Sequence, residues 1–178
     1  MKRSLILAGV TVIVCSAILL AQFPAQETNL IIGTWKQNME KSTYSPGPPP
    51  PEDSTSVRQY AAGEDGAVVA VTMNVNPQGL PSLGAISAAN YDGKEYVQHT
   101  VGTLATSLSS HIGPPVRRTI SYKPVDRYTV EIVQRQDGRV VSSSKRTIST
   151  DGKTMTERFD FVNEQGRRVT NVLVFEKQ

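Results

Sequence analysis

The residues of this chain that could do chemistry are few, and their spacing fits no common catalytic or metal-binding motif. His99 and His111 are the only histidines. Glu95 and His99 stand four residues apart on one expected strand, which separates them by about 13 Å at about 3.3 Å per residue. That distance is too great for one metal ion to bind both side chains. We therefore expect no metal site.

A short serine-rich run is the best candidate for a hydrolase nucleophile. It contains Ser107, Ser109 and Ser110 and is followed by His111. Neighbouring residues of a strand point to opposite faces, and the run does not contain the G-x-S-x-G elbow that presents a catalytic serine. The sequence carries no glycine-rich phosphate loop either. We expect no enzyme activity and no cofactor.

Three charged residues lie in the middle of expected strands in the C-terminal half. An inward arginine, at Arg146 or Arg158, could bind the carboxylate of a ligand through two parallel hydrogen bonds. Alternation places Arg158 opposite Phe159 and Phe161, and therefore in solvent. Glu157 falls on the inward face, where a carboxylate needs a partner or a position at the mouth of the fold.

Asp-Gly pairs punctuate the runs of strand-forming residues that must position these side chains. The pairs are Asp65-Gly66, Asp92-Gly93, Asp137-Gly138 and Asp151-Gly152, with Gln165-Gly166 as a looser case. Asp-Gly is a strong hairpin signal, because glycine accepts positive φ and aspartate tolerates it. Strands joined by tight turns pair with their sequence neighbours, which predicts an all-β, antiparallel up-and-down meander of about 8–10 strands closed into a barrel.

Alternation and composition set the expected strands at 31–38, 54–61, 67–75, 91–100, 116–123, 127–136, 139–149, 153–162 and 167–177. Residues 80–90 fit a weak strand, a loop or a short helix, and residues 101–110 could pair back on 91–100. The last segment is apolar on both faces, with Leu173 and Phe175 on one and Val172 and Val174 on the other. This pattern predicts an interior position beside the first strand in a closed ring.

Residues 1–21 have the layout of a secretory signal peptide. Lys2 and Arg3 precede a mainly apolar run from Leu5 to Leu20. An uncleaved anchor is the alternative, because the run is near the short end of a membrane-crossing helix, about 17 residues. We expect an exported protein, periplasmic or secreted, with an exposed leader at 22–29 and one domain at 30–178. Cys15 is the only cysteine, so the mature chain can form no disulfide.

The expected mature chain is nearly neutral. Because Lys2 and Arg3 lie in the signal segment, the net charge of +3 falls to about +1 on its removal. Nucleic-acid binding needs a basic stripe, so we expect no nucleic-acid partner.

A proline-rich loop is expected at residues 45–53. Four consecutive prolines at 48–51 cannot donate to a strand ladder and favour polyproline II geometry. The segment is most simply a stiff surface crossing between the first two strands, and a docking site for a proline-binding module is the alternative.

The opening Gly33-Thr34-Trp35 resembles the G-x-W opening of the lipocalin and fatty-acid-binding superfamily, the calycins. The ending, residues 170–177, looks like the last strand of fatty-acid-binding-like barrels. The fuller opening, which runs on to Tyr44 and the following prolines, is similar to small secreted bacterial lipocalin-like proteins of unknown function. The resemblance implies a lipocalin-like barrel in which Trp35 packs at the closed end under a basic side chain. Arg168 and Lys177 are the candidates for that side chain, through a cation–π contact.

The resemblance also implies a non-catalytic protein that binds a small apolar or amphipathic molecule inside the barrel. The residues expected to face inward are Tyr128, Val130, Ile132, Met155, Phe159, Phe161, Leu173 and Phe175. They would line a ligand site or simply fill the interior, and alternation cannot separate these two cases. The second function left open is an envelope-associated structural or interaction module with a filled barrel and no ligand.

Overall fold

A computed structural model shows one closed barrel of antiparallel strands and describes residues 30–47, 49, 54–76, 78, 80–102, 116–162 and 166–178. The strands are β1 (Gly33–Ser45), β2 (Thr55–Ala62), β3 (Val68–Val75), β4 (Pro81–Ala89), β5 (Tyr96–Gly102), β6 (Arg118–Pro124), β7 (Thr129–Gln136), β8 (Arg139–Ile148), β9 (Thr154–Val162) and β10 (Arg168–Lys177). A short 3-10 turn (Glu64–Gly66) joins β2 to β3. Within the described ranges no helix is long and apolar enough to span a membrane. The expected signal peptide (1–21) and leader (22–29), and most of the proline-rich loop, lie outside the described residues.

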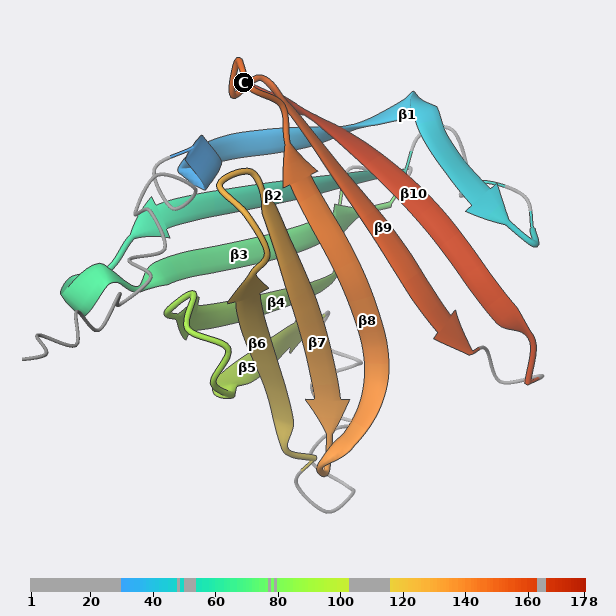
Figure 1. Ribbon diagram of the computed structural model, residues 1–178. Coiled ribbons are helices and arrows are strands. Elements are labelled where there is room, and N and C mark those ends of the chain that lie inside the picture. The colour runs from blue at the N-terminus through green and yellow to red at the C-terminus, as the bar shows by residue number, and fades with distance from the viewer. Residues whose placement is uncertain are drawn as a thin grey trace, which may run out of the picture.

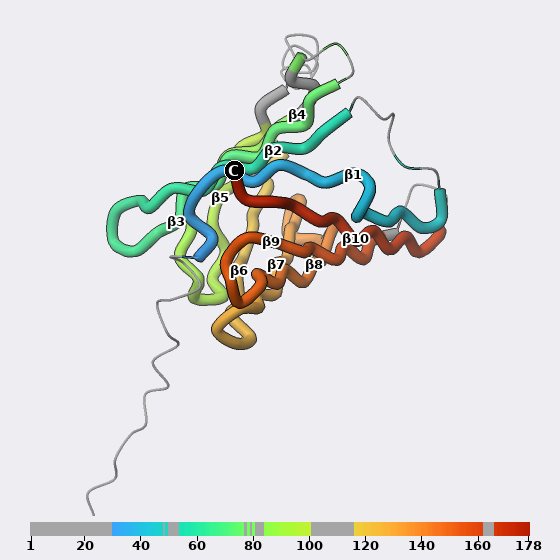
Figure 2. The backbone as a smooth tube through the Cα atoms, turned by 90° about the horizontal axis from the view of Figure 1, so that it is seen from above, coloured from blue at the N-terminus to red at the C-terminus, as the bar shows by residue number. Residues whose placement is uncertain are grey.

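Each strand pairs with its sequence neighbours, and β10 closes the ring against β1 (Figure 1). The register sets Trp35 opposite Lys177 and Phe175 opposite Gln37. Seen from above, β10 runs alongside β1 (Figure 2). The predicted all-β meander, its closure and the place of the last strand beside the first are therefore confirmed. Closure removes the exposed strand edges that would otherwise pair with other chains.

Local chemistry of the turns explains the meander. Asp137 and Gly138 both have positive φ, 49° and 78°, as a two-residue turn between β7 and β8 requires. Asp92 and Asp151 instead accept a hydrogen bond from the backbone N–H two residues further on, at 3.0 Å in each case. A hydrogen bond from the backbone to the aspartate side chain stabilises the turn even where the two flanking strands do not pair at that point.

Three segments differ most from the sequence prediction, and the other strand ends shift by at most two residues. Residues 81–89 form a strand that pairs with both β3 and β5, which resolves the ambiguity of this weakly patterned segment. The fifth strand begins at Tyr96 rather than residue 91, because the chain bends at 91–93. The first strand runs on from Asn38 to Ser45 through an irregularity between Asn38 and Thr43. A bulge of this kind bends a strand without ending it, and β1 is visibly bent (Figure 1).

The apolar core fills one end of the barrel, which we call the closed end. It consists of Ile31, Trp35, Tyr60, Val68, Ala70, Ile148, Met155 and Phe175. A second buried cluster, Ala89, Ile120, Tyr122, Val130 and Ile132, lies on the β4, β6 and β7 side. The indole N–H of Trp35 donates to the carbonyl of Ile31 at 2.7 Å, so the buried ring leaves no polar atom unsatisfied.

Candidate binding cavity

A cavity of about 590 Å³ lies inside the barrel and receives side chains from all ten strands. This volume is within the range of small-molecule sites, about 300–1,000 Å³. Lining residues near one end, Asn74, Thr100 and Arg118, are exposed, whereas Arg58, Arg146 and Glu157 are buried. The cavity therefore reaches solvent at one end, which we call the open end. Its other end meets the apolar core.

An ion pair crosses the interior from β2 to β9. The guanidinium of Arg58 donates through Nη1 to Oε2 of Glu157, and the Ser144 hydroxyl donates to Oε1 at 2.7 Å. The Arg58 guanidinium also lies 4.2 Å from the centroid of the Phe175 ring. Burial alone would raise the pKa of Glu157, but Arg58 and Arg146 outweigh it and hold the pKa below its ordinary value. The carboxylate is thus ionised and fully engaged.

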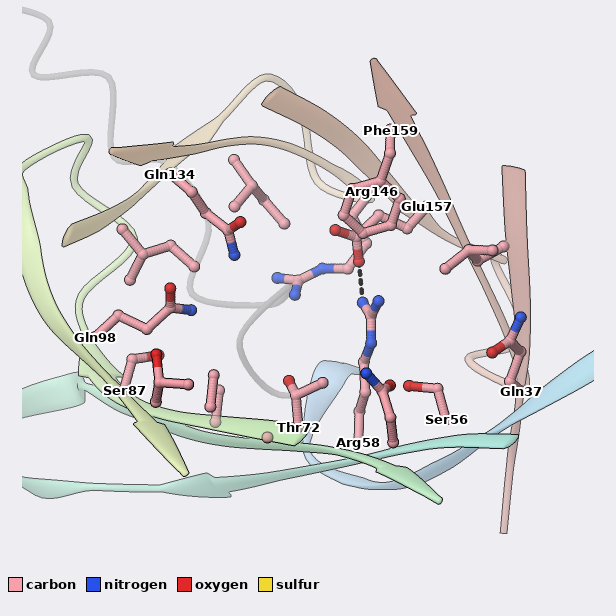
Figure 3. Close-up of a pocket in the computed structure, with 18 of the residues that line it drawn as sticks. Gln37, Ser56, Arg58, Thr72, Ser87, Gln98, Gln134, Arg146, Glu157 and Phe159 are labelled. Carbon is pink, nitrogen blue, oxygen red and sulfur yellow. Dashed lines mark hydrogen bonds and ion pairs between the residues drawn. The ribbon is translucent and has the colours of Figure 1, made fainter. Parts of the chain in front are cut away.

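A second arginine, Arg146 of β8, is 1% exposed and is surrounded by tyrosines. Its Nη1 donates to the Tyr60 hydroxyl at 3.3 Å and its Nη2 donates to the Tyr91 hydroxyl. Its guanidinium carbon lies 5.3–5.5 Å from the ring centroids of Tyr60, Tyr91 and Tyr122. Burial alone would lower the pKa of Arg146, but Tyr91, Tyr60 and Glu157 reverse that effect and raise it. Arg146 therefore carries its positive charge deep inside the barrel (Figure 3).

Tyr122 and Tyr91 stack with ring centroids 4.8 Å apart and with an angle of 13° between their planes. Burial raises the pKa of Tyr122 to about 12, with a smaller contribution from Tyr60. At neutral pH the Tyr122 side chain is consequently a neutral phenol that can donate a hydrogen bond. The tyrosines thus place polar hydroxyls around Arg146 while their rings exclude water.

The charges that line the cavity do not balance. The lining has three arginines, the buried Arg58 and Arg146 and the exposed Arg118, and one acidic side chain, the buried Glu157, so its formal charge is +2. Apolar side chains, among them Ile132, Phe159 and Leu173, contribute to the same lining. Positive charge beside apolar surface is the combination that recognises an anionic group attached to a hydrocarbon body.

The eight residues expected to face inward lie in three kinds of place. Ile132, Phe159 and Leu173 line the cavity. Val130, Met155 and Phe175 are completely buried within the two core clusters. Phe161 is half-buried on β9 and is not among the lining residues.

Tyr128, the last of the eight, lies in the bend before β7. It is half-buried, its backbone N–H donates to Asp126, and Arg127 lies over its ring at 5.2 Å. The side-chain hydrogen bond to Asp126 holds this residue in the turn, so the alternation of β7 begins one residue later, at Thr129.

Of the polar centre of the cavity, the sequence predicted an inward Glu157 and offered Arg146 as a candidate inward arginine, but it did not single out Arg58. On β2, the buried Arg58 and Tyr60 alternate with the exposed Gln59, which is the pattern of a strand with one buried face. Arg146 lies on the same face of β8 as Ser144 and Ile148, and all three are buried. The alternation along each strand is consistent with inward arginines at both positions, but it contains no information on the pairing of Arg58 with Glu157 across the barrel. Arg158 lies exposed on β9, 3.4 Å from Asp160.

At the closed end, Lys177 lies over Trp35, with the ammonium nitrogen 5.2 Å from the ring centroid. The same nitrogen donates to the Leu30 carbonyl at 3.1 Å. Arg168, the other candidate for this contact, is exposed at the opposite end of β10. The structure thus places Trp35 and Lys177 together, and Arg168 apart from them.

The remaining candidates do not converge on one site. His99 is exposed on β5, and Glu95 accepts a hydrogen bond from Thr119 and lies 3.5 Å from Arg135. The described part of the chain holds no group of three or more histidine, cysteine, aspartate or glutamate side chains able to bind a metal ion. The serine-rich run with His111 lies outside the described residues.

Comparison with protein-family models and with curated proteins finds no match. A similar solved structure is described as "Structure of EF1p2_mFAP2b bound to DFHBI". The two chains are 10% identical, the superposition covers 86% of this chain and 98% of that chain, and the TM-score is 0.44. So distant a likeness does not bear on function, which must be argued from the cavity itself.

Proposed function

We propose that this protein binds a small amphipathic acid inside the barrel and does not transform it. The observation that carries the proposal is the excess of positive charge in the cavity lining: Arg58 and Arg146 are buried with one carboxylate, Glu157, and Arg118 adds an exposed positive charge at the open end. A charge removed from water is costly unless an opposite charge compensates it. An anionic head group is therefore the part of a ligand that this cavity stabilises most.

The head group belongs beside Arg146. The guanidinium of Arg58 pairs with Glu157, whereas Arg146 donates to the hydroxyls of Tyr60 and Tyr91 and lies against the ring of Tyr122. A guanidinium fork matches a carboxylate in geometry as well as in charge. The hydrocarbon part of the ligand would then contact Ile132, Phe159 and Leu173, where burial of apolar surface adds affinity.

The proposal includes export and a calycin-like, non-catalytic role. Export is supported by the charged and apolar segment at 1–21 of the sequence. The calycin resemblance is supported by Gly33, Trp35 and the closing strand, which lie together at the closed end. The cavity favours a carrier over the alternative of a filled barrel that acts through its surface.

The test compares dodecanoate with dodecanol, which has the same chain length but no charge. We expect saturable binding of dodecanoate by calorimetry, and an affinity for dodecanol at least about tenfold lower.

Arg146→Met should weaken dodecanoate binding, whereas Arg158→Met, at the exposed arginine of β9, should leave it unchanged. Equal affinity for acid and alcohol in the wild-type protein would contradict the proposal. Native mass spectrometry of protein purified without detergent would show any co-purified acid directly.

A further inference from the structure

The two sides of the cavity differ in chemistry. Hydroxyl and amide side chains line the side formed by β2–β5: Ser56, Thr72, Asn74, Ser87, Gln98 and Thr100. We call this set the polar wall. The side formed by β6, β7, β9 and β10 contributes the apolar residues Ile120, Ile132, Phe159 and Leu173, and its polar lining residues are Arg118, Tyr122, Gln134 and Glu157. In the close-up, Ser56, Thr72 and Ser87 lie along one side of the cavity and Phe159 lies on the other (Figure 3).

The polar wall follows from the strand register. Ser87 of β4 lies opposite Gln98 of β5, and Ser56 of β2 lies opposite Asn74 of β3. Neighbouring strands are about 4.8 Å apart, so polar groups recur across the wall at intervals of a few ångströms. Small residues at the inner surface of β3 and β4, Ala70 and Ala85, leave space in front of them. The wall is therefore continuous and accessible to a ligand.

A plain hydrocarbon chain suits this wall poorly. Thr72 and Gln98 are half-buried and Thr100 is exposed, so a bound alkyl chain would remove their contact with water. Covering a polar group without giving it a hydrogen bond costs about 1–3 kcal/mol. Serine and threonine hydroxyls, and asparagine and glutamine amides, can each donate and accept, which makes hydroxyl groups on a ligand their natural partners.

We propose that the ligand is an acid that carries hydroxyl groups along one side. This inference rests on the proposed function, because it assumes that the acid group sits beside Arg146. The hydroxylated side of the ligand contacts the polar wall, and its apolar side contacts Ile132, Phe159 and Leu173. Such a site discriminates against an analogue without hydroxyl groups, because that analogue covers Thr72, Gln98 and Thr100 without giving them a hydrogen bond.

The experiment compares stearate with 9,10-dihydroxystearate, two acids with the same carbon chain, by calorimetry on the purified protein. We expect the dihydroxy acid to bind at least about tenfold more tightly, the equivalent of one or two hydrogen bonds. If stearate binds as tightly or more tightly, the polar-wall inference is overturned and the proposed function stands. If neither acid binds, the proposed function fails and the inference fails with it.

A pair of variants separates the polar wall from general effects on folding. Thr72→Val removes a hydroxyl from the wall at nearly constant volume, and Thr43→Val makes the same change at an exposed position of β1. We expect Thr72→Val to weaken binding of the dihydroxy acid several-fold and to leave stearate binding unchanged, and Thr43→Val to alter neither. A Thr72→Val variant that folds, by circular dichroism, and loses affinity for both acids equally would overturn the inference.

Discussion

At the start of β1, Gly33 occupies a backbone position that other residues rarely adopt. Its φ is +132°, and a Cβ atom built there would lie 2.8 Å from Cε of Lys177. The Lys177 side chain is held in that place by the Leu30 carbonyl and the Trp35 ring. Gly33 therefore lets three separate segments meet at the closed end: the turn before β1, the first strand and the last.

We expect Gly33→Ala to destabilise the protein by about 1–3 kcal/mol, because the new Cβ adds backbone strain and meets Lys177. Urea unfolding followed by tryptophan fluorescence measures the loss. The matched control repeats the substitution in a Lys177→Ala background, where the contact is gone and only the backbone cost is left. Equal losses in the two backgrounds would show that the Lys177 contact contributes nothing.

For individual residues, the sequence predicted the contacts of the closed end better than the contacts inside the cavity. Gly33 and Trp35 stand in a recognisable local motif, so their roles could be inferred from a few neighbouring residues. The pairing of Arg58 with Glu157 joins residues 99 positions apart. It depends on which strands face each other across the barrel, and no local pattern contains that information.

Among the strands, the seam between β5 and β6 is the weakest of those described. The described register there contains two residue pairs, Tyr96 with Ile120 and Val97 with Thr119, whereas β9 and β10 pair continuously from Arg168 to Glu176. The lower number of ladder hydrogen bonds reduces the free energy needed to open the seam locally.

Hydrogen exchange followed by mass spectrometry tests this difference. We expect peptides from β5 and the start of β6 to exchange faster at neutral pH than peptides from β9 and β10. The internal comparison is β7, which is paired along its length with β6 and β8 and should be protected like β9. Equal protection of β5 and β10 would show that packing, rather than the ladder, controls opening.

Strand existence was predictable because two signals agreed, namely alternation along the strand and aspartate or glycine at the turns. Strand β8, which follows Asp137-Gly138, begins where predicted, at residue 139. The segment at 81–89 was ambiguous, because its alanines, serines and glycine carry almost no hydrophobic contrast between its two faces. The same small residues leave room for the cavity, so the feature that hid the strand also serves the candidate site.

For the whole molecule, the cavity and the stability of the fold are linked through Glu157. Its carboxylate is the one acidic group among the lining residues, and it compensates Arg58 inside the barrel. Removing one partner of a buried ion pair leaves the other charge without compensation, at a cost of about 3–5 kcal/mol. The stability of the fold therefore depends on pH through the charge of Glu157.

Glu157→Gln should lose about 3–5 kcal/mol of unfolding free energy at pH 7, and this loss should shrink in acid. The folded pKa of Glu157 lies below its usual value of 4.5. Its ionisation therefore stabilises the fold fully above that value, and the contribution disappears as the pH falls through the lowered pKa. Urea unfolding at pH 7 and at several pH values below 4.5 measures the trend.

Glu176→Gln is the matched control, because Glu176 pairs with Lys41 in solvent and should affect stability little at any pH. A loss for Glu157→Gln that is the same at every pH would show that the side chain acts by packing and not by charge.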